Sequence, residues 1–188
     1  MFGFNKGKPL IEGPIEFTAE VAIDRPVAEV FPLVDLADAR FRHVQTGAQV
    51  RRVEGQDNRF DMIVDAVLER KPGERYALEA AMVPQLFALV KSVETHVFEA
   101  ISDTKCRVIL TTLATFDPDL SDEDIVGESA MMTQAVMGEM EKLKVLAEDG
   151  LDALKAMEEA EMDFEIDFDV DLDLGELDID WGDIEPEQ

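Results

Sequence analysis

Cysteine and long apolar runs are both scarce in this chain of 188 residues. The single cysteine, Cys106, excludes an internal disulfide and any zinc site built from several cysteines. It lies in an alternating, strand-like run, so a packed or surface thiol is expected there in place of a nucleophile. No apolar stretch approaches the length of a membrane span, and the N-terminus lacks the apolar region of a secretion signal. We therefore expect a cytoplasmic protein that does not insert into membranes.

Recognisable catalytic motifs are missing as well. The sequence has no nucleophile elbow, no Gly-rich phosphate loop and no zincin motif. Its two histidines, His43 and His96, are far apart in the chain, and neither belongs to a metal-ligand pattern. We therefore predict no catalytic residue, no metal and no cofactor. Tyr76 or His96 would serve as an acid or base only if its side chain points inward, and structural roles are commoner for both.

Basic side chains are few. The chain has 17 Lys and Arg against 43 Asp and Glu, which gives a net charge of −26. Such a chain repels nucleic acid and anionic membrane surfaces, so basic proteins or cations are its natural partners. Fifteen of the acidic residues and none of the basic ones lie between Glu158 and the C-terminus. Charge therefore separates an acidic tail, residues 158–188, from the rest of the chain.

The acidic tail alternates with a period of two. From Met162 to Leu174, an apolar residue occupies every even position and Asp or Glu every odd one. Gly175 interrupts the pattern, which then resumes as far as Trp181. An extended backbone would place the carboxylates on one face and the apolar side chains on the other. We predict that the tail binds a partner through Phe164, Ile166, Phe168, Asp167, Asp169, Asp171 and Trp181.

The energetic balance decides whether this tail orders by itself. Burying its apolar side chains well would contribute about 10 kcal/mol or more, while ordering the backbone of residues 162–174 costs about 13–26 kcal/mol. The tail is therefore expected to order only against an apolar surface of opposite charge. Two such surfaces stay open: a sheet edge of its own domain, where Arg40–Arg75 is locally basic, or a basic partner protein. A disordered acidic segment is the alternative, and calcium binding is disfavoured because carboxylates in one line do not enclose an ion.

Alternating and helical patterns fill the rest of the chain. After an arm over residues 1–14, a half-buried strand is expected at Ile15–Ile23. Asp24 and Pro26 then start a short helix that runs to about Asp35, and a second short helix is expected at Leu36–His43. Further strands are predicted at residues 44–53, 58–69, 75–83, 92–101 and 105–117, with residues 85–90 as a short strand or a loop.

A long helix is predicted from Ser121 to Met157. Ser121 is a typical N-cap residue, and carboxylates fill the first turn at the positive end of the helix dipole. Gly150 is expected to bend or divide the helix. Glu139 and Glu141 are expected on its solvated face. Apolar residues recur at helical spacing, at Ile125, Met132, Val136, Met140, Leu143, Ala147, Leu151 and Leu154.

These elements predict an α+β fold. An antiparallel sheet with one apolar face must be covered, and the terminal helix is the only element long enough to cover it. We expect a curved antiparallel sheet of six or seven strands wrapped around the long C-terminal helix, with two short helices after the first strand. This domain would span residues 15–157.

Two segments resemble a known family. They are FTAEVAIDRPVAEVFPLV, from Phe17 to Val34, and ETHVFEAISDTKCRVILTTLATFDP, from Glu94 to Pro118. Both are similar to the START-type or helix-grip superfamily (SRPBCC), which includes the birch pollen allergens and polyketide-cyclase-like proteins. The resemblance covers roughly residues 15–157 and implies a cavity for lipids, quinones, polyketides or other apolar molecules between sheet and helix. The acidic tail is not part of that fold.

The wall of such a cavity is predicted from residues that face inward on the expected strands and helix. Methionine adapts its shape to variable ligands, so a Met-rich wall suits this role, although the same residues would also serve as plain core. The candidates are Phe60, Met62, Tyr76, Met82, Leu110, Phe116, Met132 and Val136.

Three functions follow from these observations. We expect binding or carriage of an apolar small molecule without chemistry, with the tail as a regulatory or partner-binding segment. The first alternative is an enzyme of the cyclase or dehydratase type that uses an inward Tyr76 or His96. The second is an interaction protein that acts through its acidic tail.

Overall fold

The computed structural model describes residues 13–35, 42–44, 49–51, 61–83, 85 and 88–167. The chain divides into two units, Met1–Lys155 and Ala156–Gln188. Most of the described residues belong to the first unit, which holds the sheet, one short helix and one long helix.

The sheet has five long strands and two short ones. All neighbours are antiparallel, in the order β1-β7-β6-β5-β4-β3-β2. The long strands are β1 (Ile15–Ile23), β4 (Asp61–Lys71), β5 (Arg75–Val83), β6 (Leu89–Ser102) and β7 (Lys105–Phe116). The short strands are β2 (Arg42–Val44) and β3 (Gln49–Arg51). The predicted six or seven strands are reached only when these three-residue strands are counted.

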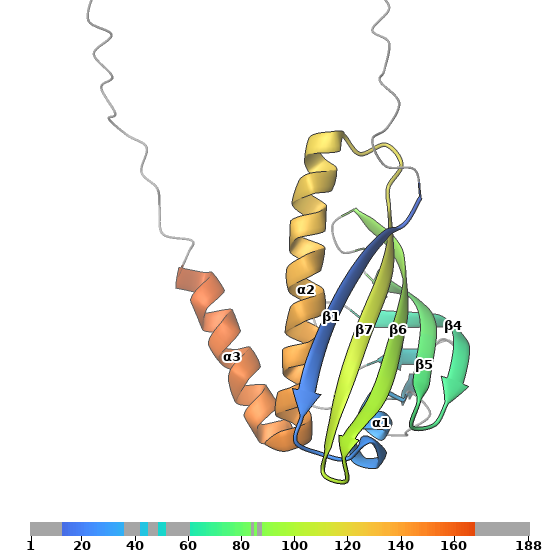
Figure 1. Cartoon of the computed structure of the whole chain (residues 1–188). Coiled ribbons are helices and arrows are strands. Elements are labelled where there is room, and N and C mark those ends of the chain that lie inside the picture. The colour runs from blue at the N-terminus through green and yellow to red at the C-terminus, as the bar shows by residue number, and fades with distance from the viewer. Residues whose placement is uncertain are drawn as a thin grey trace, which may run out of the picture. The chain divides into compact units, whose positions relative to one another are not determined.

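Among the described strands, β1 lies at an edge of the sheet and pairs only with β7. Its inward side chains alternate as predicted: Phe17 and Ile23 are buried, whereas Glu16 and Glu20 are exposed. Figure 1 shows the long strands curving beside α2, which runs alongside β1. The sheet therefore presents one apolar face to the long helix, as the helix-grip prediction requires.

The short helix α1 (Val27–Val34) follows the first strand as predicted. Its apolar side packs into the core through Val30, Phe31 and Val34. Asp35, which is buried at the end of α1, accepts hydrogen bonds from the Arg70 guanidinium of β4 at 2.5 to 3.1 Å. This pair joins the helix to the sheet.

The long helix α2 (Asp122–Glu148) begins where the sequence predicts. Ser121 caps it, and its side-chain oxygen accepts a hydrogen bond from the backbone N–H of Asp124 at 3.2 Å. The helix buries a stripe of three side chains in the core, Val136, Met140 and Leu143. Gly150 has a φ of 88°, a left-handed conformation that suits glycine, and it separates α2 from α3 (Leu151–Asp167). The predicted division at Gly150 is therefore confirmed.

Two local predictions are wrong. The second short helix was expected to end at His43, but Arg42 and His43 belong to strand β2. Residues 44–53 were expected as one strand, but Val44 ends β2 and Gln49–Arg51 form the antiparallel strand β3. On β4, Val64 is buried whereas the exposed fraction of Leu68 is 55%. The ladder between β4 and β5 shifts register between Val64 and Ala66 and again between Val67 and Glu69. Each shift breaks the alternation of side chains, so the inward face ends at Val64.

The start of the alternating tail is helical. α3 continues to Asp167, so the backbone of Met162–Asp167 is helical where period-two alternation suggested an extended chain. The remainder of the tail lies outside the described residues. Within the described part of the chain, no helix combines the length and the apolar character that crossing a membrane requires.

Candidate functional site

Three polar side chains point inward from the middle of the sheet. Ser92, Glu94 and His96 occupy alternate positions of β6, and all three are buried, with His96 fully so. The Ser92 hydroxyl donates to a carboxylate oxygen of Glu94 at 3.4 Å. We call these three residues the polar row. Its members lie on the same face of the sheet as the core.

The neighbouring strands surround the polar row with mostly apolar side chains. Glu94 is paired with Leu78 of β5 and with Thr112 of β7, and both of these residues are buried. His96 is paired with Tyr76 and Leu110, which are also buried. A carboxyl group and an imidazole thus lie among the apolar residues of the inner face.

The long helix adds a second carboxyl group to this place. A Glu139 carboxylate oxygen of α2 lies 3.9 Å from Nε2 of His96, and the Glu139 side chain is 24% exposed. Glu139 was predicted on the solvated face of the helix, and this prediction is wrong, because its side chain reaches the sheet. The neighbouring Glu141 is exposed.

The residues predicted to line a cavity have several locations. Tyr76, Leu110 and Val136 are buried in the core. Met82, Phe116 and Met132 are partly buried and pack against it. Met62 belongs to β4 and Phe60 lies outside the described residues, as do Phe168, Asp169, Asp171 and Trp181 of the tail. Phe164, Ile166 and Asp167 lie in α3. A role in ligand binding for any of these residues stays a prediction.

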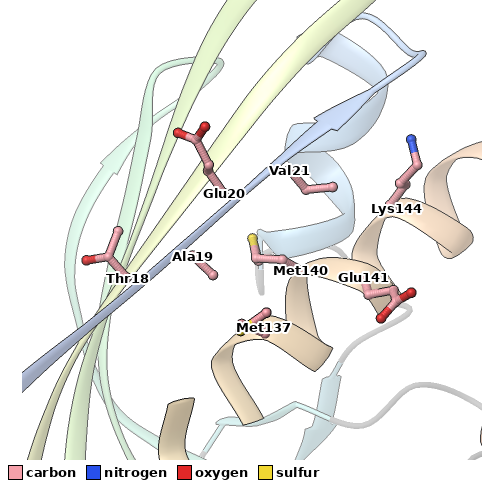
Figure 2. Close-up of a pocket in the computed structure, with 8 residues that line it drawn as sticks. All are labelled: Thr18, Ala19, Glu20, Val21, Met137, Met140, Glu141 and Lys144. Carbon is pink, nitrogen blue, oxygen red and sulfur yellow. The ribbon is translucent and has the colours of Figure 1, made fainter. Parts of the chain in front are cut away.

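A groove of about 410 Å³ lies on the other flank of α2, between the helix and the edge strand β1. Figure 2 shows Ala19 and Val21 turned toward the helix, whereas Thr18 and Glu20 turn away from it. None of the predicted cavity residues lines this groove. Its helix side is formed by Met137, Met140, Glu141 and Lys144.

One end of the groove is closed by a network of polar contacts. The Lys144 ammonium donates to the backbone carbonyl of Ala22 at 2.9 Å and to a carboxylate oxygen of Glu148 at 2.8 Å. The backbone N–H of Asp24 and then Lys144 lower the pKa of Glu148 from its ordinary value. A hydrogen bond from Lys105 lowers the pKa of Asp24 in turn. These contacts fasten the end of β1 to the end of α2.

Sequence reasoning missed the polar row for a definable reason. On β6 the odd positions hold Val93 and Val97, so hydropathy alone predicts that Ser92, Glu94 and His96 point outward. The signal that corrects this is register, because His96 is paired with the inward residues Tyr76 and Leu110. Among the described residues, no three His, Cys, Asp or Glu side chains are grouped to hold a metal ion.

Comparisons with known proteins identify similar folds at low sequence identity. No family model matches the chain, and no curated protein matches it. An Aha1 dimer structure from Colwellia psychrerythraea is 11% identical, with a TM-score of 0.48, over 72% of this chain and 98% of that one. A START superfamily protein from Mycobacterium smegmatis is 13% identical, with a TM-score of 0.42, over 70% and 99%. Ara h 8.0201 is 17% identical, with a TM-score of 0.40, over 68% and 98%.

Proposed function

We propose that the helix-facing surface of the sheet binds an apolar small molecule and that the polar row holds a polar group of that molecule. The observation that carries the proposal is the burial of Ser92, Glu94 and His96 in succession on one strand. Their surroundings are largely apolar, as a ligand with an oily body requires.

The free-energy cost of burying polar side chains indicates that the polar row has a role beyond packing. Taking a polar group out of water costs about 1–3 kcal/mol that its contacts must offset, and burying a charge costs more. Leucine or valine at these three positions would serve a simple core better. The inward polar groups are therefore a specific feature, and a ligand with one hydrogen-bonding group would make use of it.

Glu139 is the residue through which this proposal is best tested. Its side chain is partly exposed, so Glu139→Gln is expected to fold, while it changes the carboxylate that lies 3.9 Å from the His96 imidazole. Glu141→Gln is the matched control, because Glu141 is exposed on the same helix. The neutral dye Nile red serves as the apolar probe, and native mass spectrometry of freshly purified protein detects a retained ligand.

The proposal expects saturable Nile red binding that Glu139→Gln weakens and Glu141→Gln leaves unchanged. A retained apolar compound in the mass spectrum would support it directly. Protein that carries no apolar compound and shows no saturable dye binding would contradict it.

Proton transfer on the bound molecule is a second candidate function. Tyr76 and His96 are directly opposite each other in the ladder, both buried, and a Glu139 oxygen lies 3.9 Å from the imidazole. A histidine held beside a carboxylate is a common general base. Deuterium exchange at the carbons next to the carbonyl of 2-decanone, followed by NMR, tests this activity. Exchange that is lost in His96→Gln would support it, and exchange at the buffer rate in the native protein would contradict it.

The acidic tail remains a proposed binding segment for a basic protein. Its charge and its alternation support this role. Capture of a purified basic protein by the full chain, and loss of that capture when residues 168–188 are removed, would test it. Equal capture by both chains would contradict it.

A further inference from the structure

The groove between β1 and α2 combines three features of a peptide-binding site. It has an edge strand along one side, an apolar surface along the other, and carboxylates at its rim. The proposed function uses none of these features, because the polar row lies on the opposite flank of α2.

The edge of β1 directs backbone groups toward the groove. The Ala22 carbonyl accepts a hydrogen bond from Lys144 of α2, so it points away from β7. Successive residues of a strand alternate the direction of their N–H and C=O groups, so Thr18 and Glu20 turn the same way as Ala22. The hydroxyls of Thr18 and Thr111 lie 3.4 Å apart, which fits a pair whose backbone groups face outward.

The helix side of the groove offers exposed apolar surface. Met137 is 61% exposed although it lies beside the core residue Met140 in the groove wall. Ala19 and Val21 face these methionines from the strand (Figure 2). An exposed methionine next to apolar residues is typical of surfaces that bind a flexible partner.

The charges around the groove identify the chemistry of the partner. Glu20 and Glu141 line the groove and are exposed, and Glu16 is exposed on the same face of β1 as Glu20. A Glu20 carboxylate oxygen lies 3.8 Å from the Arg107 guanidinium. The Lys144 ammonium is already occupied by Ala22 and Glu148. A strand added beside β1 would place every second side chain next to Glu16 and Glu20, where basic residues are favoured.

We propose that this groove binds an extended segment of a basic partner protein, which adds as a strand to the edge of β1 that no other described strand occupies. Apolar side chains of the segment contact Met137, and the alternate basic side chains lie beside Glu16 and Glu20. Strand addition next to a helix is a known mode of peptide recognition. The chain's own acidic tail has the same alternation with carboxylates, so like charges disfavour it as the occupant.

Two exposed positions on α2, Met137 and Val126, give a matched test. Met137→Glu puts a charge into the groove, while Val126→Glu adds the same charge on the same helix at a site that is 70% exposed and outside the groove lining. A third variant, Thr18→Pro, removes one outward N–H from the edge strand, a position where proline is tolerated. The probes are labelled five-residue peptides that alternate Lys with Val or Glu with Val, measured by fluorescence anisotropy with the full chain.

The Lys–Val peptide is expected to bind about tenfold or more tightly than the Glu–Val peptide. Met137→Glu and Thr18→Pro should each weaken its binding about tenfold, whereas Val126→Glu should change it by less than about twofold. Peptide binding that survives Met137→Glu unchanged would be diffuse attraction to the acidic chain and would overturn the proposal. Equal binding of a Lys–Val peptide with N-methylated backbone would overturn strand addition.

Discussion

The backbone N–H of Asp24 donates a hydrogen bond to a carboxylate oxygen of Glu148, 2.6 Å away, although these residues lie near opposite ends of the folded domain's sequence. The Arg25 guanidinium donates to the Glu148 backbone carbonyl at 2.8 Å, so both residues of the turn after β1 contact the end of α2. The end of α2 is therefore held by the turn that follows β1.

Acid should loosen this connection. The pKa of Glu148 is lowered from 4.5, so its carboxylate stabilises the fold above the unfolded pKa, and this stabilisation is lost as the pH falls through the folded pKa. We expect Glu148→Gln to lower the melting temperature at pH 7. Between pH 6 and pH 3, the melting temperature of the variant should fall less than that of the native chain. Thermal unfolding followed by circular dichroism measures both effects. The same pH profile in the variant and the native chain would refute this role for Glu148.

The pair of Asp35 and Arg70 should stabilise the junction of α1 and β4. The Asp35 side chain is 7% exposed and Arg70 is 47% exposed, so solvent screens the guanidinium on one side. Arg70→Met is expected to lower the urea concentration at the midpoint of unfolding, because a mostly buried carboxylate loses a charged donor. Urea titration measures the change, and Arg75→Met, on the neighbouring strand and 47% exposed, is the control.

Leu110 should be among the most sensitive core positions. It is fully buried at the centre of β7, so Leu110→Ala is expected to cost about 2–5 kcal/mol through lost burial and the space left behind. Ile101→Ala removes an aliphatic side chain that is 55% exposed near the β6–β7 turn, and it should cost less than about 0.5–1 kcal/mol. Chemical denaturation of both variants compares them directly, and equal losses would contradict the assignment of Leu110 to the core.

Cys106 should react with thiol reagents only when the domain opens. It is fully buried, and burial raises the pKa of its thiol, so both access and thiolate content are low. We expect labelling by a maleimide at neutral pH to be slow in the native chain and rapid in urea. Rapid labelling without denaturant would show that the strand carrying Cys106 opens readily.

The sequence predicted those elements whose local signals agree with their surroundings. β1 and β5 have the predicted bounds, and Ser121 and Gly150 mark the start and the division of the terminal helix as expected. At each of these places, alternation, capping or backbone freedom points to the same structure as the tertiary contacts.

The inner face of β6 depended on information that a single strand does not contain. Hydropathy favours Val93 and Val97 as inward residues, but the ladder positions on β5 and β7 turn Glu94 and His96 inward. The register shifts of β4 are equally hard to predict from the sequence, because the residues around Leu68 carry no pattern that indicates them. Glu139 was missed for a related reason, because its partner His96 had been assigned no side of the sheet. The candidate site therefore emerges from pairing between strands, and local pattern alone does not reveal it.

The placement of β1 at the sheet edge beside β7 has a consequence for biosynthesis. Ile15 is paired with Ala114 and Ile23 with Cys106, so the first strand has no ladder partner until the last strand has left the ribosome. At about 5–20 residues per second, the nascent first strand waits for several seconds with its apolar side chains unburied. A chaperone that binds nascent chains would protect these apolar side chains most effectively during that interval.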